Sequence, residues 1–170
     1  ARGEEGEGAT WLEIEWNEET ERAAREALEA RQDQPMNKKD ADQYEEQAKG
    51  YWEKFYAHFT DKFFKDRNYL LKEFPELNNK PEVVMEVGCG VGNTVIPLME
   101  SMPEPTRFHA FDFSANAVRV MQQRSNFNPA RCHGFVCDAT DPDSLAQNIP
   151  ANSVDIAMAI FCLSAISREK

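Results

Sequence analysis

The glycine-rich loop at residues 86–93, with the sequence EVGCGVGN, has the residue types best suited to ligand binding in this chain. Glycine permits a tight turn and lets a ligand approach the backbone closely. The dinucleotide-binding fingerprint GxGxxG requires glycine at its sixth position, where this chain has Asn93. The spacing here is GxGxG, which argues against a loop that binds a pyrophosphate.

Two aspartates follow the loop at the spacing of successive strand ends. Asp112 ends an expected strand 24 residues after Gly88, and Asp138 ends the next one. Open α/β sheets bind ligands at the carboxyl ends of their strands, so Asp112 could accept ribose hydroxyls and Asp138 could meet an adenine edge. Glu86 lies on the same face as Gly88, where it either supports the loop or meets a cationic group of the ligand. The alternative is that both aspartates only cap turns and helices.

Alternating strands and helices are expected to position these groups. Apolar stretches predict strands over residues 82–87, 106–111, 132–137 and 154–161. Helices are predicted between the strands over residues 94–102, 115–124 and 143–148, and before them over residues 18–31, 40–59 and 66–74. This alternation predicts an α/β fold with a doubly wound parallel sheet.

The last expected strand, residues 154–161, indicates an incomplete sheet. Its almost wholly apolar sequence is typical of a strand that is buried on both faces and has neighbours on both sides. As a terminal strand it would be an exposed edge. We therefore expect the first four strands of a larger sheet, with the C-terminal strands missing.

The chain divides into three expected parts. Residues 1–38 form an acidic extension, partly disordered or helical, and residues 39–79 form a helical segment. Residues 80–170 form the ligand-binding α/β domain, which is expected to be incomplete at its C-terminus.

Composition and charge narrow the class of protein. The formal net charge is -11, which argues against a generic nucleic-acid binder, so any such contact must be local. No apolar run approaches the roughly 18 residues of a membrane helix, so no membrane partner is expected. The four cysteines lack zinc-ligand spacing, so we expect no metal and free thiols in a reducing compartment. The cytoplasm is the expected location, with mitochondria and the nucleus left open.

Residues 51–70 interleave aromatic and basic side chains, as YWEKFY at residues 51–56 and FFKDRNYL at residues 63–70. With EFPEL at 73–77, EVGCGVGN, FDFS at 111–114, VCDAT at 136–140 and FCLSAI at 161–166, the chain resembles the tRNA N3-methylcytidine methyltransferases. The stretch NYLLKEFPEL is most similar to the branch that acts on threonine and arginine tRNAs. The resemblance covers about residues 44–166, and the spacing GxGxG also favours a methyltransferase loop.

The resemblance implies a Rossmann-like class I methyltransferase with S-adenosyl-L-methionine as cofactor and the tRNA anticodon loop as substrate. It makes residues 39–79 a cofactor lid and tRNA-binding segment, and it leaves room for an accessory protein that selects the tRNA. The expected cofactor-binding residues are Trp52, Tyr56, Glu86, Gly88, Gly90, Asp112, Phe113, Asp138, Ala139 and Ile160. The expected RNA-binding residues are Phe63, Phe64, Lys65, Asp66 and Arg67.

Physical chemistry makes these roles reasonable and leaves alternatives. Trp52 and Tyr56 share a helix face and aromatic faces attract a sulfonium cation, although both residues also fit an ordinary core stripe. Phe63 and Phe64 fit a core equally well, and the bases of this segment fit a solvated turn. We expect Lys65 and Arg67 to lie outside the crevice at the strand ends.

No catalytic residue is expected, because the N3 atom of cytosine carries a free lone pair and attacks without a general base. Alignment of the reacting atoms alone can lower a barrier by ~7 kcal/mol or more. The target base has to leave its stack, so aromatic and basic groups should hold it. The alternatives are a non-catalytic RNA-binding or partner subunit with this fold and a small-molecule methyltransferase.

Overall fold

The computed structural model describes residues 17–32, 36–60 and 63–167, which fall into two compact units, Ala1–Asp42 and Gln43–Lys170. The first unit contains α1 (Glu18–Gln32). Asn17 caps this helix, because its Oδ1 atom accepts the backbone N–H groups of Glu19 and Thr20, both at 3.0 Å. The cap confirms the expected helix start. The next helix, α2 (Lys38–Phe59), continues into the second unit.

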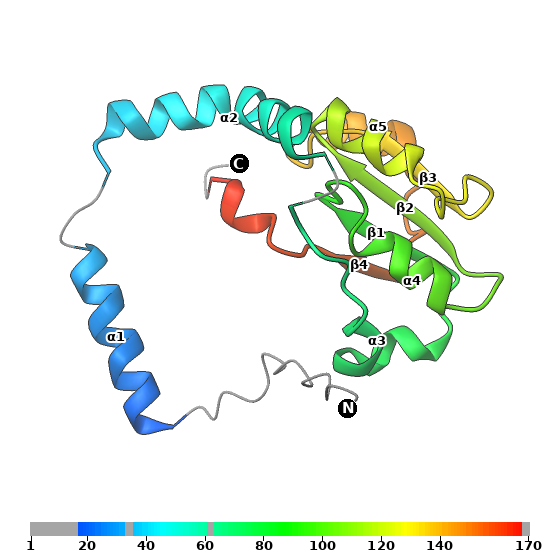
Figure 1. Cartoon of the computed structure of the whole chain (residues 1–170), viewed down its shortest axis with the longest axis horizontal. Helices are drawn as coiled ribbons and strands as arrows, with labels where there is room; N and C mark the ends of the chain where they lie inside the picture. The colour runs from blue at the N-terminus through cyan, green and yellow to red at the C-terminus, as the bar shows by residue number, and fades with distance from the viewer. Residues whose placement is uncertain (1–16, 33–35, 61–62, 168–170) are drawn as a thin grey trace, which may run out of the picture. The chain divides into compact units, whose positions relative to one another are not determined.

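A four-stranded parallel sheet with the order β3-β2-β1-β4 lies at the centre of the second unit (Figure 1). Its strands are β1 (Val83–Val87), β2 (Arg107–Asp112), β3 (Cys132–Val136) and β4 (Ile156–Met158). The helices α4 (Val95–Ser101), α5 (Ala115–Gln123) and α6 (Pro142–Asn148) connect them in sequence. Parallel strands joined by helices confirm the predicted α/β, Rossmann-like fold.

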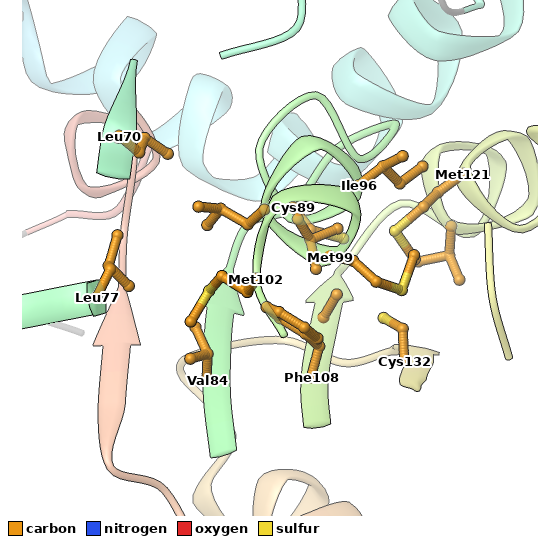
Figure 2. Packing of buried hydrophobic residues seen from close by; sticks show 14 residues of the cluster. Leu70, Leu77, Val84, Cys89, Ile96, Met99, Met102, Phe108, Met121 and Cys132 are labelled. Carbon is orange, nitrogen blue, oxygen red and sulfur yellow. The ribbon is translucent and has the colours of Figure 1, made fainter. Parts of the chain in front are cut away.

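Helices cover both faces of this sheet. On one face α4 and α5 pack against the strands, and Figure 2 shows Ile96, Met99 and Met121 beside Phe108 of β2 and Cys132 at the start of β3. On the other face Leu145 of α6 packs against a second cluster formed around Phe111 and Phe135. The alternation of side chains along each strand therefore supplies two cores.

The predicted helix over residues 66–74 is shorter in the structure. The regular helix, α3, spans only Leu70–Glu73, and a short 3-10 helix follows at Pro75–Asn79. The backbone N–H of Arg67 donates to the carbonyl oxygen of Asn93 at 2.8 Å. Because this donor is used in a tertiary contact, the residues before Leu70 follow an extended and turning path.

The strand predicted over residues 154–161 is also shorter, at Ile156–Met158. Asp155 lies just before it, and its Oδ2 atom accepts the backbone N–H groups of Glu82 and Val83. Ala157 is exposed and β4 forms an edge of the four-stranded sheet, as expected of this strand when no outer neighbour is present. Phe161 has a positive φ of 55°, which is incompatible with a continued strand.

Within the described ranges, no helix has the length and apolar character needed to cross a membrane.

Candidate functional site

A cavity of about 150 Å³ lies at the carboxyl ends of the strands, between the glycine loop and α2. Its wall contains every residue that the sequence analysis assigned to a cofactor: Trp52, Tyr56, Glu86, Gly88, Gly90, Asp112, Phe113, Asp138, Ala139 and Ile160. The fold thus brings residues from five separate segments to one place, where open α/β sheets bind their ligands.

The glycine loop begins directly after β1 and needs glycine for its backbone shape. Gly88 and Gly90 have φ values of 67° and 53°, in the left-handed region that side chains rarely adopt. A Cβ atom on Gly90 would lie 2.6 Å from Tyr56 Oη, and one on Gly88 would lie 2.5 Å from Cys162 Cβ. Larger residues at either position would therefore push away the walls of the cavity.

Asp112 fastens this loop to the end of β2. Its Oδ2 atom accepts the N–H of Gly90 at 3.0 Å, and its Oδ1 atom accepts the N–H of Ser114 at 2.9 Å. The side chain is buried, and burial raises its pKa although these two hydrogen bonds oppose the rise. Each carboxylate oxygen has a second lone pair, so Asp112 keeps acceptor capacity for ligand hydroxyls.

Asp138 lies at the end of β3 and is exposed. Its Oδ1 atom accepts both the backbone N–H and the hydroxyl of Thr140, at 2.9 and 2.7 Å. These bonds form a local turn and hold the carboxylate at the cavity wall. Asp138 therefore stabilises a turn, which was the alternative role considered for it, and also lines the cavity.

Glu86 is a fully buried acid that supports the helix after the glycine loop. Its Oε2 atom accepts the N–H of Val95, the first residue of α4, at 3.0 Å. Burial raises the pKa of Glu86 to about 8, and hydrogen bonding from Thr94 opposes the rise. Of the two roles expected for this residue, support of the loop is the one with a contact in the structure.

Trp52 and Tyr56 lie one turn apart on α2 and form one wall of the cavity. Their rings stack with centroids 5.8 Å apart and an interplanar angle of 26°. Tyr56 also packs in a small cluster with Val91 of the glycine loop and Ala117 of α5. Burial, together with the negative charge of Asp112, raises the pKa of Tyr56, so its hydroxyl stays protonated.

Glu53 attaches α2 to the sheet domain through the N-terminus of α5. Its carboxylate accepts the backbone N–H groups of Ala115 at 2.6 Å and Asn116 at 3.2 Å. An acid at a helix N-terminus satisfies free donors and is stabilised by the helix dipole. This contact fixes the helix that carries Trp52 over the strand ends.

The FFKDR segment, residues 63–67, lies closer to the cavity than expected. Phe64 and Arg67 line the cavity, so the expectation that Arg67 lies outside the crevice is wrong. Asp66 forms a bidentate ion pair with Arg124 at 2.7 and 2.9 Å. Phe63 and Lys65 are exposed and lie outside the cavity wall. The error arose because these residues were expected to form a surface turn and the start of a helix, whereas the backbone of Arg67 bonds to Asn93 of the glycine loop.

Sequence reasoning missed the residues that join distant segments. Glu53, Asn93 and Arg124 hold α2, the glycine loop and the FFKDR segment together through contacts between residues more than 25 positions apart in sequence. Asn93 was noted only as a departure from the dinucleotide fingerprint. No local pattern marks Glu53 or Arg124, because a helix surface of this kind ordinarily carries charges.

Comparison with known proteins agrees with this fold and site. A family model described as "Methyltransferase domain" matches residues 84–170, which is just over half of the chain and includes the glycine loop, β1 from its second residue and the other three strands. The chain belongs to this methyltransferase domain family.

More specific relatives extend the similarity through α2. The tRNA N(3)-methylcytidine methyltransferase Mettl2 of Drosophila melanogaster is 37% identical over 94% of this chain, which covers 52% of that protein. The tRNA(Thr) (cytosine(32)-N(3))-methyltransferase of Saccharomyces cerevisiae is 36% identical over 92% of this chain, which covers 26% of it. The chain spans 52–62% of the length of the curated animal relatives METTL2 and Mettl2.

A solved structure supports the fold independently. A SAM-dependent methyltransferase from Anabaena variabilis aligns with a TM-score of 0.50 and 21% identity over 74% of this chain and 49% of that one. At this identity the likeness extends to the fold, in agreement with the parallel sheet described above.

Proposed function

We propose that this protein is an S-adenosylmethionine-dependent tRNA methyltransferase that forms N3-methylcytidine in the anticodon loop. The observation that carries the proposal is that the glycine loop, Asp112 and the aromatic pair of α2 line the same cavity. The names of the relatives at 36–37% identity support the choice of tRNA and of the N3 atom.

The residues of the cavity fit the proposed cofactor. Asp112 has carboxylate lone pairs for ribose hydroxyls, and the absence of a side chain at Gly90 leaves the backbone accessible beside Tyr56. The faces of Trp52 and Tyr56 suit a sulfonium cation. When bound, the cofactor supplies a methyl group on a positively charged sulfur.

The chain's own residues would bind and orient the reactants and exclude water. Asp112 and the glycine loop hold one end of the cavity, and the stacked Trp52 and Tyr56 cover it from α2. Tyr56 remains protonated because burial raises its pKa, so it serves as a wall and a hydrogen-bonding group and not as a base. Rate acceleration would come from alignment in a dry site, and no catalytic acid or base is required.

The RNA side of the proposal concerns the FFKDR segment. Phe63, with 55% of its surface exposed, and the exposed Lys65 are available for a base and a phosphate. A single-stranded loop is recognised by stacking of unpaired bases on aromatic rings and by phosphate contacts. Phe64, Asp66 and Arg67 belong to the same proposed contact segment, with Phe64 and Arg67 at its cavity side.

We also propose that the protein acts in the cytoplasm, alone or with an accessory protein that selects the tRNA. Cys89, Cys132 and Cys137 are buried free thiols and Cys162 is a partly buried one, which suits a reducing compartment.

The deciding experiment measures transfer of labelled methyl groups from S-adenosylmethionine to total tRNA, followed by nucleoside analysis. Formation of N3-methylcytidine, lost in Asp112→Ala, would support the proposal. Cofactor binding by calorimetry without any RNA product would favour a small-molecule methyltransferase. Failure to bind the cofactor at all would favour a non-catalytic subunit.

A further inference from the structure

Asn93 links the glycine loop to the FFKDR segment through three hydrogen bonds. Its Nδ2 atom donates to the carbonyl oxygen of Phe64 at 3.1 Å and to Asp66 Oδ1 at 2.9 Å. Its own carbonyl oxygen accepts the N–H of Arg67 at 2.8 Å. Asn93 is 5% exposed, so its side of these bonds is buried, while its partners Phe64 and Asp66 lie at the surface.

Asp66 connects Asn93 to α5. Both of its carboxylate oxygens accept from the guanidinium of Arg124, the residue that ends α5, at 2.7 and 2.9 Å. The two side chains are 34% and 15% exposed, and the geometry is the bidentate one in which arginine pairs are strongest. Asp66 therefore sits between the glycine loop and the helix after β2.

Arg67 contacts residues on two sides of the cavity. Its Nη1 atom donates to Thr94 Oγ1 at 3.1 Å, beside the N-terminus of α4. Its guanidinium lies 5.7 Å from the ring centroid of Phe161, beyond the end of β4. A cation engaged in this way is poorly placed to neutralise a phosphate on the surface.

Four residues of the FFKDR segment differ in their surroundings. Asp66 bonds to Asn93 of the glycine loop and Arg67 lines the cavity. Lys65 is exposed, and Phe63 is 55% exposed while its ring packs against Phe55 and Phe59 of α2. A carboxylate repels phosphate, so Asp66 gains nothing from direct contact with RNA. Its contacts instead connect the glycine loop to the chain directly beside Lys65.

We propose that Asp66 and Arg67 are positioning residues, which together with Asn93 form a latch that couples cofactor occupancy to RNA binding. The coupling half of this inference rests on the proposed function. When the glycine loop is ordered by a ligand, the latch holds Phe63 and Lys65 in the arrangement that binds RNA. By linkage, RNA binding tightens the cofactor by the same factor.

The first test measures S-adenosylhomocysteine affinity by calorimetry. Asp66→Asn loses the charge that Arg124 binds and should weaken the affinity about tenfold. Asp143→Asn, an equivalent change at an exposed position of α6, serves as the matched control and should change nothing. Arg124→Gln breaks the latch from the other side and provides the same test if Asp66→Asn folds poorly.

The second test measures the affinity of a synthetic anticodon stem-loop with and without saturating S-adenosylhomocysteine. We expect the unaltered protein to bind the RNA about fivefold or more tightly with the ligand, within the usual range for coupled sites. Asp66→Asn should bring this ratio close to one. Lys65→Ala should weaken RNA binding equally with and without S-adenosylhomocysteine, so that the ratio of the two RNA affinities stays unchanged. A change that merely destabilised the fold would not separate the two variants in this way.

The outcomes separate the latch from the proposed function. If the unaltered protein binds the ligand and the RNA, and Asp66→Asn and Arg124→Gln leave both the ligand affinity and the ratio unchanged, the latch is wrong and the proposed function stands. If the unaltered protein binds no S-adenosylhomocysteine, the proposed function falls, and the latch falls with it.

Discussion

Buried carboxylates hold the backbone of this site together. Asp112 accepts two backbone N–H groups and Glu86 accepts one, and each connects a strand of the sheet to the loop or helix that borders the cavity. Burial raises the pKa of both acids. Asp112 has a partner on each oxygen, whereas Glu86 is the more deeply enclosed and shows a pKa of about 8. The same functional group is therefore fixed as a cavity-lining acceptor in one place and as a pH-sensitive support in the other.

Asp112→Ala tests the ligand-facing role. If Asp112 binds the ribose as proposed, the change removes charge-assisted bonds, each worth roughly 1.5–3 kcal/mol, so S-adenosylmethionine affinity should fall on the order of a hundredfold or more. It also leaves the N–H groups of Gly90 and Ser114 without their acceptor. Calorimetry should therefore be paired with a thermal melt, with Asp143→Ala as control. Unchanged affinity in a folded variant would remove Asp112 from the binding site.

Glu86→Gln tests the pH-sensitive role. The pKa of Glu86 is raised from 4.5 to about 8 in the folded state, so between these values the folded state holds a proton that the unfolded state has lost. The stabilisation is complete below about pH 4.5 and disappears as the pH rises through about 8, with a slope of up to roughly 1.4 kcal/mol per pH unit. Glutamine keeps an oxygen for the N–H of Val95 and cannot ionise.

The free energy of unfolding from urea titrations should therefore depend less on pH in Glu86→Gln than in the unaltered protein. The two proteins should be similar near pH 5, and the variant should be more stable by roughly 2–4 kcal/mol near pH 8. A difference that is constant across this range would show that Glu86 does not change its protonation state on unfolding.

At the level of secondary structure, side chains bind the exposed ends of neighbouring helices. Glu53 of α2 caps the N-terminus of α5. Arg131, just before β3, performs the opposite task at the end of α4, because its guanidinium donates to the carbonyl oxygens of Met99, Met102 and Thr106. Helix ends lack internal partners for their last backbone groups, so an acid at one end and a base at the other join elements that are separate in sequence.

Glu53→Ala should detach α2 from α5. Loss of a helix cap costs about 1 kcal/mol, and cofactor affinity should fall as well, because Trp52 and Tyr56 lie on the same helix. Burial alone would raise the pKa of Glu53, but the hydrogen bonds from Ala115 and Asn116 outweigh it and lower the pKa. The difference in unfolding free energy between the unaltered protein and Glu53→Ala should therefore shrink as the pH falls below 4.5, the usual pKa of a glutamate side chain.

Calorimetry and urea titration of Glu53→Ala, beside the exposed control Glu46→Ala, measure both effects. If the two variants behave alike, the contact between α2 and α5 contributes nothing to the site.

Arg131→Ala should destabilise the junction of α4, β2 and β3. The side chain is 9% exposed, and its removal leaves several buried carbonyl groups without a donor, at a cost of roughly 3 kcal/mol. Arg131→Lys keeps the charge but loses the planar fork, so its stability should lie between those of the unaltered protein and Arg131→Ala. Thermal unfolding followed by circular dichroism measures the series. A lysine variant as stable as the original protein would show that charge alone accounts for the role.

At the scale of the whole molecule, charge restricts where RNA can bind. The net charge of -11 gives no general attraction for a polyanion. Contacts must then be concentrated in a few places, and the FFKDR segment contributes one outward base, Lys65, because Arg67 is turned toward the cavity. In the proposed RNA complex this segment would therefore neutralise fewer phosphates than its composition indicates.

Lys65→Ala should lower the affinity for tRNA and reduce the slope of log affinity against log salt concentration by about one unit, one phosphate contact. Arg67→Ala should leave the slope nearly unchanged and weaken S-adenosylhomocysteine binding. Binding titrations across a salt series measure both. An equal loss of slope in the two variants would return Arg67 to the RNA surface.

Local sequence determined most of the framework. The periodicity of apolar residues placed each strand start and helix of the α/β sheet within a few residues, and the glycine loop with Asp112 and Asp138 predicted the place where the structure has its cavity. These features could be read because they depend on neighbours in sequence: turn geometry requires glycine, and the ends of parallel strands meet at one edge of the sheet.

Tertiary structure alone decided how the loop, α2 and the FFKDR segment fit together. The turn of Arg67 toward the cavity, the pairing of Asp66 with Arg124 and the cap from Glu53 depend on partners distant in sequence. The shortening of α3 has the same origin, because the N–H of Arg67 donates to Asn93 instead of entering a helix. The strand β4 ends before Phe161, whose φ is positive. A charged side chain carries no local mark of whether its partner is water or another segment, and only the folded chain supplies that partner.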